Sequence, residues 1–225
     1  MTNGTASSLR MAARGKKGQI DIYGIIGGDG FFEDGITADY FAKELKKMGS
    51  VNEIDVHINS DGGDAFQGRT IYSLLSAHQA KVTVYVDGLA ASAASLIAMA
   101  GDEIVMAEGS FMMIHEAWGA VRGRAKDLRQ RADTMDQVNE TMAQTYAKRS
   151  GQPYKKVRQM MDEETWMEAS VAHSLGFADT LSEPVQVAAC VQHPEIFKNL
   201  PAKLRPNASA ALRLISGMKN PAPRR

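Results

Sequence analysis

The stretch "VYVDGLAASAASLIAMAGDEI", Val84 to Ile104, decides how this sequence folds. It begins and ends with the Val- and Ile-rich composition of β-strands. Between these ends lie twelve uncharged, mostly small residues, 89–100, which include Ser92 and Ser95. A strand, a short helix and a strand in direct succession indicate a mostly parallel sheet covered by helices. The stretch also raises the question whether either serine does chemistry.

Strand and helix patterns alternate on both sides of this stretch, which predicts the α/β fold class. Alternating or Val- and Ile-rich runs predict strands at 19–27, 53–60, 81–86, 102–107 and 111–116. Helical spacing of apolar residues predicts helices at 37–49, 65–78, 92–100, 124–149, 153–161 and 169–176. The helix at 124–149 is long for a domain of this size. We expect either that it projects and packs on another subunit or that it is an ordinary surface helix of its own domain.

The ends of the chain are basic and the middle is acidic, although the formal net charge is zero. Residues 1–18 carry four basic side chains and residues 201–225 carry six, with no acid in either range. We therefore predict a flexible basic segment at 1–18, one domain at 19–182 and a basic, mostly disordered tail at 183–225, with short helices in the tail as an option. Solubilising tails are favoured over contacts with nucleic acid or acidic partners, so no specific nucleic-acid partner is expected.

The composition indicates a soluble cytoplasmic protein. A single cysteine, Cys190, excludes an intramolecular disulfide and fits a reducing compartment. The apolar run at 89–100 is too short to span a membrane, which takes about 20 residues. Neither a signal peptide, nor Cys and His at metal-binding spacing, nor a phosphate-binding glycine fingerprint is visible. We expect no metal, no cofactor and no membrane contact.

Ser92 follows the expected strand at 81–86 and stands at the expected start of a helix. Free backbone N–H groups at a helix N-terminus can stabilise an oxyanion, so Ser92 could be a nucleophile. A serine at this place can equally be an N-cap, which is the more common role. Ser95, three residues further on, is expected to face packing neighbours.

A serine nucleophile needs a base and a partner that orients the base. Among the five histidines, His115 ends the apolar run "SFMMIH" and precedes a glycine-containing loop. Ligands bind at the carboxyl ends of strands in α/β sheets, which makes His115 the best candidate base. The segment "NSDGGDAF", 59–66, adds a glycine pair between a strand and a helix that can point backbone amides at a ligand.

Taken together, these segments resemble the proteolytic subunit of the Clp protease, ClpP, over about residues 20–182. Four segments carry the resemblance in order: "INSDGGDAFQGRTIY", "GLAAS", "MIH" and "ETWMEASVAHSLGFAD". The resemblance implies the ClpP/crotonase-type fold, in which stacked ββα units close into a small superhelix with a projecting long helix.

The resemblance also implies a role for each matched residue. Ser92 would be the nucleophile, His115 the general base and Glu164 the triad acid, while the amides of Gly63 and Ala93 would form the oxyanion hole. Glu164 stands where the family has Asp, and Asp162 and Glu163 stand beside it, so the identity of the acid stays open among these three.

The family implies a serine endopeptidase that needs no cofactor and assembles into rings. We expect a hexamer or heptamer, with stacking to a tetradecamer as one option. The stretches "HEAWG" and "ETWMEA" resemble the Clp-like proteases of tailed phages and prophages most, which implies cleavage of scaffold or capsid proteins in the host cytoplasm or the prohead. The alternatives are a host-type subunit that works with a Clp ATPase, a catalytically silent assembly protein, and an acyl-CoA enzyme of the related crotonase fold.

Overall fold

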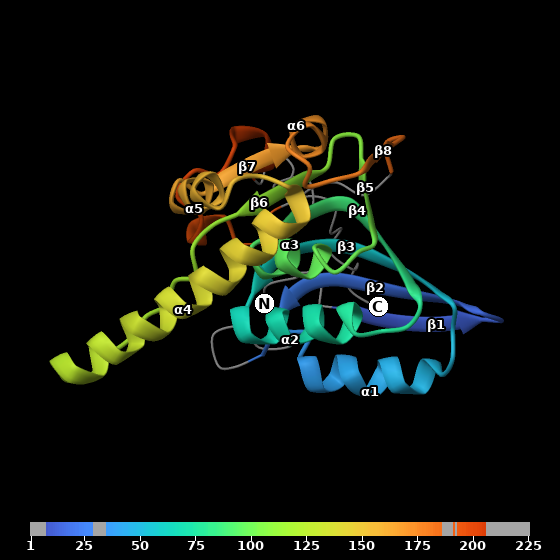
Figure 1. Ribbon diagram of the computed structural model, residues 1–225, viewed down its shortest axis with the longest axis horizontal. Coiled ribbons are helices and arrows are strands. Elements are labelled where there is room, and N and C mark those ends of the chain that lie inside the picture. The colour runs from blue at the N-terminus through green and yellow to red at the C-terminus, as the bar shows by residue number, and fades with distance from the viewer. Residues whose placement is uncertain (1–7, 29–34, 186–190, 192, 206–225) are drawn as a thin grey trace, which may run out of the picture.

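A mixed sheet of eight strands forms the centre of the computed structural model, which describes residues 8–28, 35–185, 191 and 193–205 (Figure 1). Strands β2 (Lys17–Ile26), β3 (Glu53–Gly63), β4 (Lys81–Ala91) and β5 (Glu103–Ala107) lie side by side and run parallel. Helices α1 (Ala38–Met48), α2 (Ala65–Ser76) and α3 (Ala93–Ala98) connect them. This α/β architecture agrees with the fold class predicted from the sequence.

Alternating side chains attach these helices to the sheet. In β3, Ile54, Val56 and Ile58 are fully buried, whereas the residues between them are half-buried. The buried set belongs to one core with Phe41 of α1 and Ile71 of α2. The strand predicted at 53–60 is therefore confirmed, and every second residue of it lies on the core side, as a period of two requires.

The sheet branches at β4, and this branch brings distant segments to one edge. β5 pairs with the first half of β4, and β6 (Phe111–Ile114) pairs in parallel with residues 89–91 at its end. β7 (Thr165–Glu168) then pairs with β6 in the antiparallel direction. The carboxyl ends of β4 and β6 and the start of β7 therefore meet at the same edge of the sheet.

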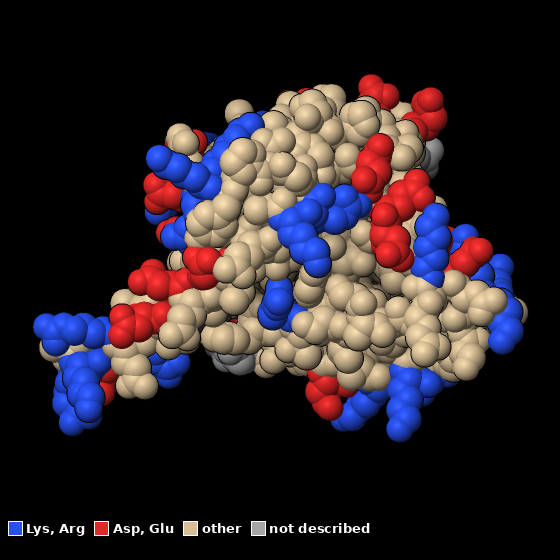
Figure 2. Space-filling model, in the orientation of Figure 1, with Lys and Arg blue, Asp and Glu red and all other residues tan. Residues whose placement is uncertain are grey.

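Helix α4 (Ala125–Ser150) projects from the body of the protein (Figure 1). Its first half is mostly exposed, and its buried residues begin at Asn139 and continue with Met142, Ala143 and Tyr146. Lysine and arginine side chains gather at the projecting end (Figure 2). The buried residues that anchor the long helix thus lie in its second half.

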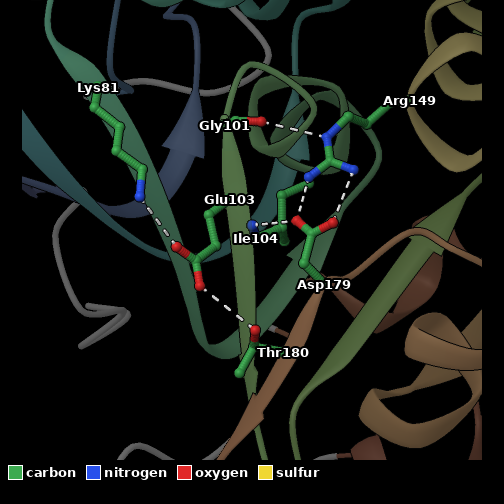
Figure 3. A network of polar contacts seen from close by, with 7 residues as sticks. All are labelled: Lys81, Gly101, Glu103, Ile104, Arg149, Asp179 and Thr180. Carbon is green, nitrogen blue, oxygen red and sulfur yellow. Dashed lines mark hydrogen bonds and ion pairs between the residues drawn. The ribbon is translucent and has the colours of Figure 1, made fainter.

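A polar network fastens the anchored end of α4 to the sheet (Figure 3). Arg149 forms an ion pair with Asp179 and donates from Nε to the carbonyl of Gly101 at 3.3 Å. Asp179 also accepts from the amide of Ile104 in β5 at 2.7 Å. Asp179 directly precedes β8 (Thr180–Ser182), which follows α5 (Tyr154–Asp162) and α6 (Ala169–Ser174). These contacts tie α4, β5 and β8 into one unit.

The structure differs from the sequence expectation at the N-terminal segment. Within the range 1–18, Ser8–Arg14 forms strand β1, which pairs antiparallel with β2. The chain reverses at Gly15, whose φ of 61° suits glycine. Leu9 and Met11 alternate with polar residues and pack against the core, a short pattern that the basic composition obscured.

The C-terminal segment also differs from the disordered tail expected at 183–225. Residues 193–205 pack on the domain with two short 3₁₀ turns, Pro194–Ile196 and Ala202–Leu204. Phe197, Leu200 and Leu204 are buried against a second apolar cluster that consists of Leu89, Ala91, Phe111, Met113 and Val191. Irregular apolar spacing without a helix or strand period hid this packing from sequence reasoning. Cys190 and residues 206–225 lie outside the described residues.

The described residues contain neither a helix suited to span a membrane nor a cluster suited to hold a metal ion. None of the helices there has the length and apolar character that a membrane span requires. Within the same residues, His, Cys, Asp and Glu side chains form no group of three or more suited to a metal ion.

Candidate active site

Ser92 and His115 meet at the edge where β4 and β6 end. Their ladder pairs Ala91 with Met113, and the amide of Ser92 donates to the carbonyl of Met113 at 3.0 Å. From this position the Ser92 Oγ lies 2.7 Å from the His115 Nε2. The hydroxyl and the imidazole are therefore within hydrogen-bond distance, as a serine nucleophile and its base require.

The backbone at Ser92 adopts a rare conformation. Its φ is 54° and its ψ is −122°, a region that costs a non-glycine residue on the order of 1–3 kcal/mol. Such a strained strand-to-helix turn exposes the Oγ of the nucleophile in α/β hydrolases. The side chain of Ser92 caps no amide of α3, so the N-cap alternative is not what the structure has.

Gly62 lets the β3–α2 turn approach this serine closely. A Cβ added at Gly62 would stand 2.5 Å from the carbonyl oxygen of Ala91 and 2.7 Å from the Cβ of Ser92. Its φ of 93° also favours glycine. The glycine pair in "NSDGGDAF" is thus required by packing against the serine turn.

The two expected oxyanion donors lie beside Ser92. Ala93 is the first residue of α3, where a backbone N–H has no partner within the helix. Gly63 lines the same cavity as Ser92 and His115, and this cavity has a volume of about 550 Å³. Its walls are largely apolar and include Phe66, Trp118, Met135, Val138, Met142 and Phe197. Apolar groups of a ligand would fit such a lining.

Burial sets the protonation state of His115. The residue is 7% exposed, and its burial lowers the pKa of the imidazole below its ordinary value. The charge of Glu164 acts against this effect, and that of Lys198 adds to it. The neutral imidazole therefore prevails at neutral pH, which is the form that accepts a proton.

Glu164 is buried near this pair and directly precedes β7. Its carboxylate accepts hydrogen bonds from the Trp166 Nε1 at 3.1 Å, the Lys198 amide at 2.9 Å and the Asn199 amide at 2.7 Å. Within the described residues it forms no hydrogen bond with His115. The structure thus places Glu164 within electrostatic reach of the imidazole, with its oxygens held by other donors.

The two neighbouring acids are placed differently. Asp162 and Glu163 are both exposed, and Glu163 accepts from the Gln159 Nε2 at 2.8 Å. Neither contributes to the pKa shift of His115, whereas Glu164 does. Of the three acids that the sequence left open, only Glu164 has the burial and the electrostatic contact expected of an acid that orients the imidazole.

Comparison with known proteins gives the family. The model of the Clp protease family matches residues 33–185. The chain belongs to the Clp protease family. Membership of this family implies a serine peptidase. The match ends at residue 185, so the packed segment 193–205 lies beyond it.

A solved structure of the same family shares the fold. A variant of ClpP1 from Listeria monocytogenes superposes with a TM-score of 0.64 at 24% sequence identity. The similarity covers 73% of this chain and 91% of the ClpP1 chain. The ClpP-like fold inferred from the sequence is therefore confirmed.

Sequence reasoning missed two hydroxyl groups that support the Ser92 turn in this Clp protease family member. Ser95 is fully buried, and its Oγ donates to the carbonyl of Ser92 at 2.7 Å. It can then accept from the hydroxyl of Tyr146 at 2.9 Å. Burial raises the pKa of Tyr146, so this phenol stays protonated. A serine that bonds three residues back is a readable local signal, but Tyr146 reaches the site only through α4.

The other histidines have different partners. The Nδ1 of His57 lies 3.0 Å from the Asp87 carboxylate, and the Nδ1 of His78 accepts from the Ala80 amide at 3.0 Å. His193 lies 3.3 Å from Glu195. Among the described histidines, His115 is the one that hydrogen-bonds to Ser92.

Proposed function

We propose that this chain is a serine endopeptidase in which Ser92 is the nucleophile, His115 the general base and Glu164 the acid that orients the base. The observation that carries the proposal is the 2.7 Å contact between Ser92 Oγ and His115 Nε2 on a strained strand-to-helix turn. A catalytically silent assembly protein would have no need of this strain or of the buried base, and strain of this kind clusters at active sites.

The proposed chemistry follows from the positions of these groups. His115 Nε2 takes the hydroxyl proton as Ser92 Oγ attacks the peptide carbonyl, and the amides of Gly63 and Ala93 stabilise the resulting oxyanion. His115 then returns the proton to the leaving amine, and water releases the acyl group by the same steps in reverse. These reaction steps require no cofactor.

Labelling with a fluorophosphonate probe tests the proposal directly. We expect one label per active subunit, and peptide mapping by mass spectrometry should place it on Ser92, because among the described residues this is the hydroxyl that hydrogen-bonds to an imidazole. Ser92→Ala should remain unlabelled. A label on another residue, or none on a folded and assembled protein, would contradict the proposal and favour an acyl-CoA enzyme or a silent assembly protein.

We further propose that the subunits form a hexameric or heptameric ring, with a stacked tetradecamer as the larger form. Support comes from the family and from the first half of α4, which is exposed and carries Leu128 at 42% exposure. Light scattering after gel filtration should give a six-, seven- or fourteenfold multiple of 24.4 kDa. A particle with the mass of one chain would contradict the ring.

The biological role that we propose is maturation of a phage capsid, by cleavage of scaffold or capsid proteins in the host cytoplasm or the prohead. Its support is the resemblance of "HEAWG" and "ETWMEA" to Clp-like proteases of tailed phages. A gene that stands between portal and capsid genes would favour this role. A gene beside that of a Clp ATPase would instead favour a host-type subunit that works with an unfoldase.

A further inference from the structure

The segment of residues 193–205 packs directly on the candidate active site, although it lies beyond the match to the family. The ring of Phe197 lies 6.3 Å from that of His115 and makes an edge contact with Trp166 at 5.2 Å between centroids. Ile196 and Phe197 also line the cavity that contains Ser92. The segment is therefore part of the wall of the site.

The same segment supplies two of the three hydrogen bonds to the carboxylate of Glu164. Oε1 accepts from the Asn199 amide and the Trp166 indole, and Oε2 accepts from the Lys198 amide. A carboxylate has about four acceptor positions. Oε2 thus keeps the capacity to accept a further hydrogen bond, and catalytic hydrogen bonds in unliganded enzymes often tighten only when substrate binds.

Several contacts outside the carboxylate fix the segment in place. Its apolar residues Phe197, Leu200 and Leu204 are buried in the second apolar cluster. The Asn199 side chain donates to the carbonyl of Glu163 at 2.8 Å. The Lys203 ammonium lies 2.5 Å from the Glu168 carboxylate and 4.6 Å from the centre of the Phe111 ring. Contacts that precede and follow Lys198 and Asn199 in the chain therefore hold their two amides in place at Glu164.

We propose that segment 193–205 is a positioning element of the active site, and that its Lys198 and Asn199 amides hold the Glu164 carboxylate beside His115. This inference rests on the proposed peptidase function. A buried carboxylate without donors carries a large desolvation cost and would turn toward water. The segment removes that cost and, through Phe197, keeps the imidazole buried.

An inhibitory role for the segment would change kcat in the opposite direction. A segment that drew Glu164 away from His115 would act as an inhibitor, and its loosening would raise activity. The sign of the change in kcat therefore decides between the two roles.

Replacing Lys198 by proline in the full chain tests the inference, because proline has no amide N–H. We expect Lys198→Pro to lower kcat about 10²-fold, the cost of a misplaced catalytic group, with a small change in KM. Lys198→Ala keeps the amide and serves as the matched control, which should lose much less. An increase in kcat, or equal losses in the two variants, would overturn the inference.

A double-mutant cycle with Glu164→Ala separates positioning from general loss of structure. If the amide acts through Glu164, Lys198→Pro should lower activity less than about 3-fold in that background. A full 10²-fold further loss there would show that the proline acts through the fold and would overturn the inference.

A second variant covers the case in which Lys198→Pro does not fold. Phe197→Ala frees the segment from the second apolar cluster and leaves both amides in the chain, so it should also lower kcat. Fluorophosphonate labelling of the wild-type protein distinguishes a failure of the proposed peptidase function from a failure of the positioning role. Absence of label on Ser92 refutes the peptidase itself, whereas a labelled Ser92 with unchanged Phe197→Ala kinetics refutes only the positioning role.

Discussion

Replacing Ser92 by alanine should lower kcat for peptide hydrolysis about 10⁶-fold, as removal of a serine nucleophile does in other serine proteases. The reason is that His115 Nε2, 2.7 Å from the Ser92 Oγ, then has no hydroxyl to deprotonate. The substrate can still bind against the apolar cavity walls, so KM should change little. Turnover of a fluorogenic peptide by wild type and variant measures both constants.

Ser95→Ala is the matched control for this experiment. Ser95 lies on the same helix and is fully buried, but its hydroxyl contacts the carbonyl of Ser92 and the hydroxyl of Tyr146. Its removal costs two hydrogen bonds, but the Tyr146 hydroxyl, 3.4 Å from the Ser92 carbonyl, can take the place of the first. We therefore expect a loss of about 10-fold, equivalent to roughly 1.4 kcal/mol. Similar kcat values for the two alanine variants would refute the nucleophilic role of Ser92.

The serine and the histidine could be predicted because each follows a strand that the sequence displays clearly. β4 and β6 are Val- and Ile-rich or continuously apolar, and parallel strands bring their carboxyl ends together. The geometry of Ser92 and His115 then depends on one ladder pair, Ala91 with Met113. Local composition and topology thus marked Ser92 and His115 as candidates, whereas the resemblance to the Clp protease family suggested their roles.

The surroundings of Glu164 could not be predicted in the same way. β7 has four residues, too few for a period to stand out, and it was not among the expected strands. Two of the three donors to the Glu164 carboxylate are the amides of Lys198 and Asn199, more than thirty residues away. Backbone amides carry no residue-specific signal, so nothing in the sequence marks these two positions as part of the site.

A related limit applies to the ends of the chain. The basic residues between positions 8 and 14 and between 193 and 205 made both segments read as solubilising tails. Each nevertheless places a few apolar side chains on the domain, such as Met11 and Phe197, while its basic side chains stay at the surface. Composition averages over these positions, but packing depends on the few that face inward.

Replacing Glu164 by glutamine should lower kcat about 10⁴-fold, the effect of losing the acid that holds a catalytic histidine in its useful tautomer. Glu163→Gln is the matched control, since it makes the same chemical change one residue away on an exposed side chain. We expect that control to lose less than about 10-fold, because surface substitutions away from a site have small effects. Equal losses would assign the acid elsewhere.

The pH dependence of the residual activity gives an independent test of the same assignment. The negative charge of Glu164 raises the pKa of His115 against the larger opposing effect of burial. Glutamine carries no charge, so in Glu164→Gln the pKa of His115 should fall further.

The base must be neutral to work, and activity is lost as the pH falls through its pKa. The acid limb of kcat/KM, measured between about pH 4 and 8, should therefore move to lower pH in Glu164→Gln and stay in place in Glu163→Gln. An acid limb that does not move in Glu164→Gln would mean that this carboxylate does not act on His115, even if the loss of kcat were large.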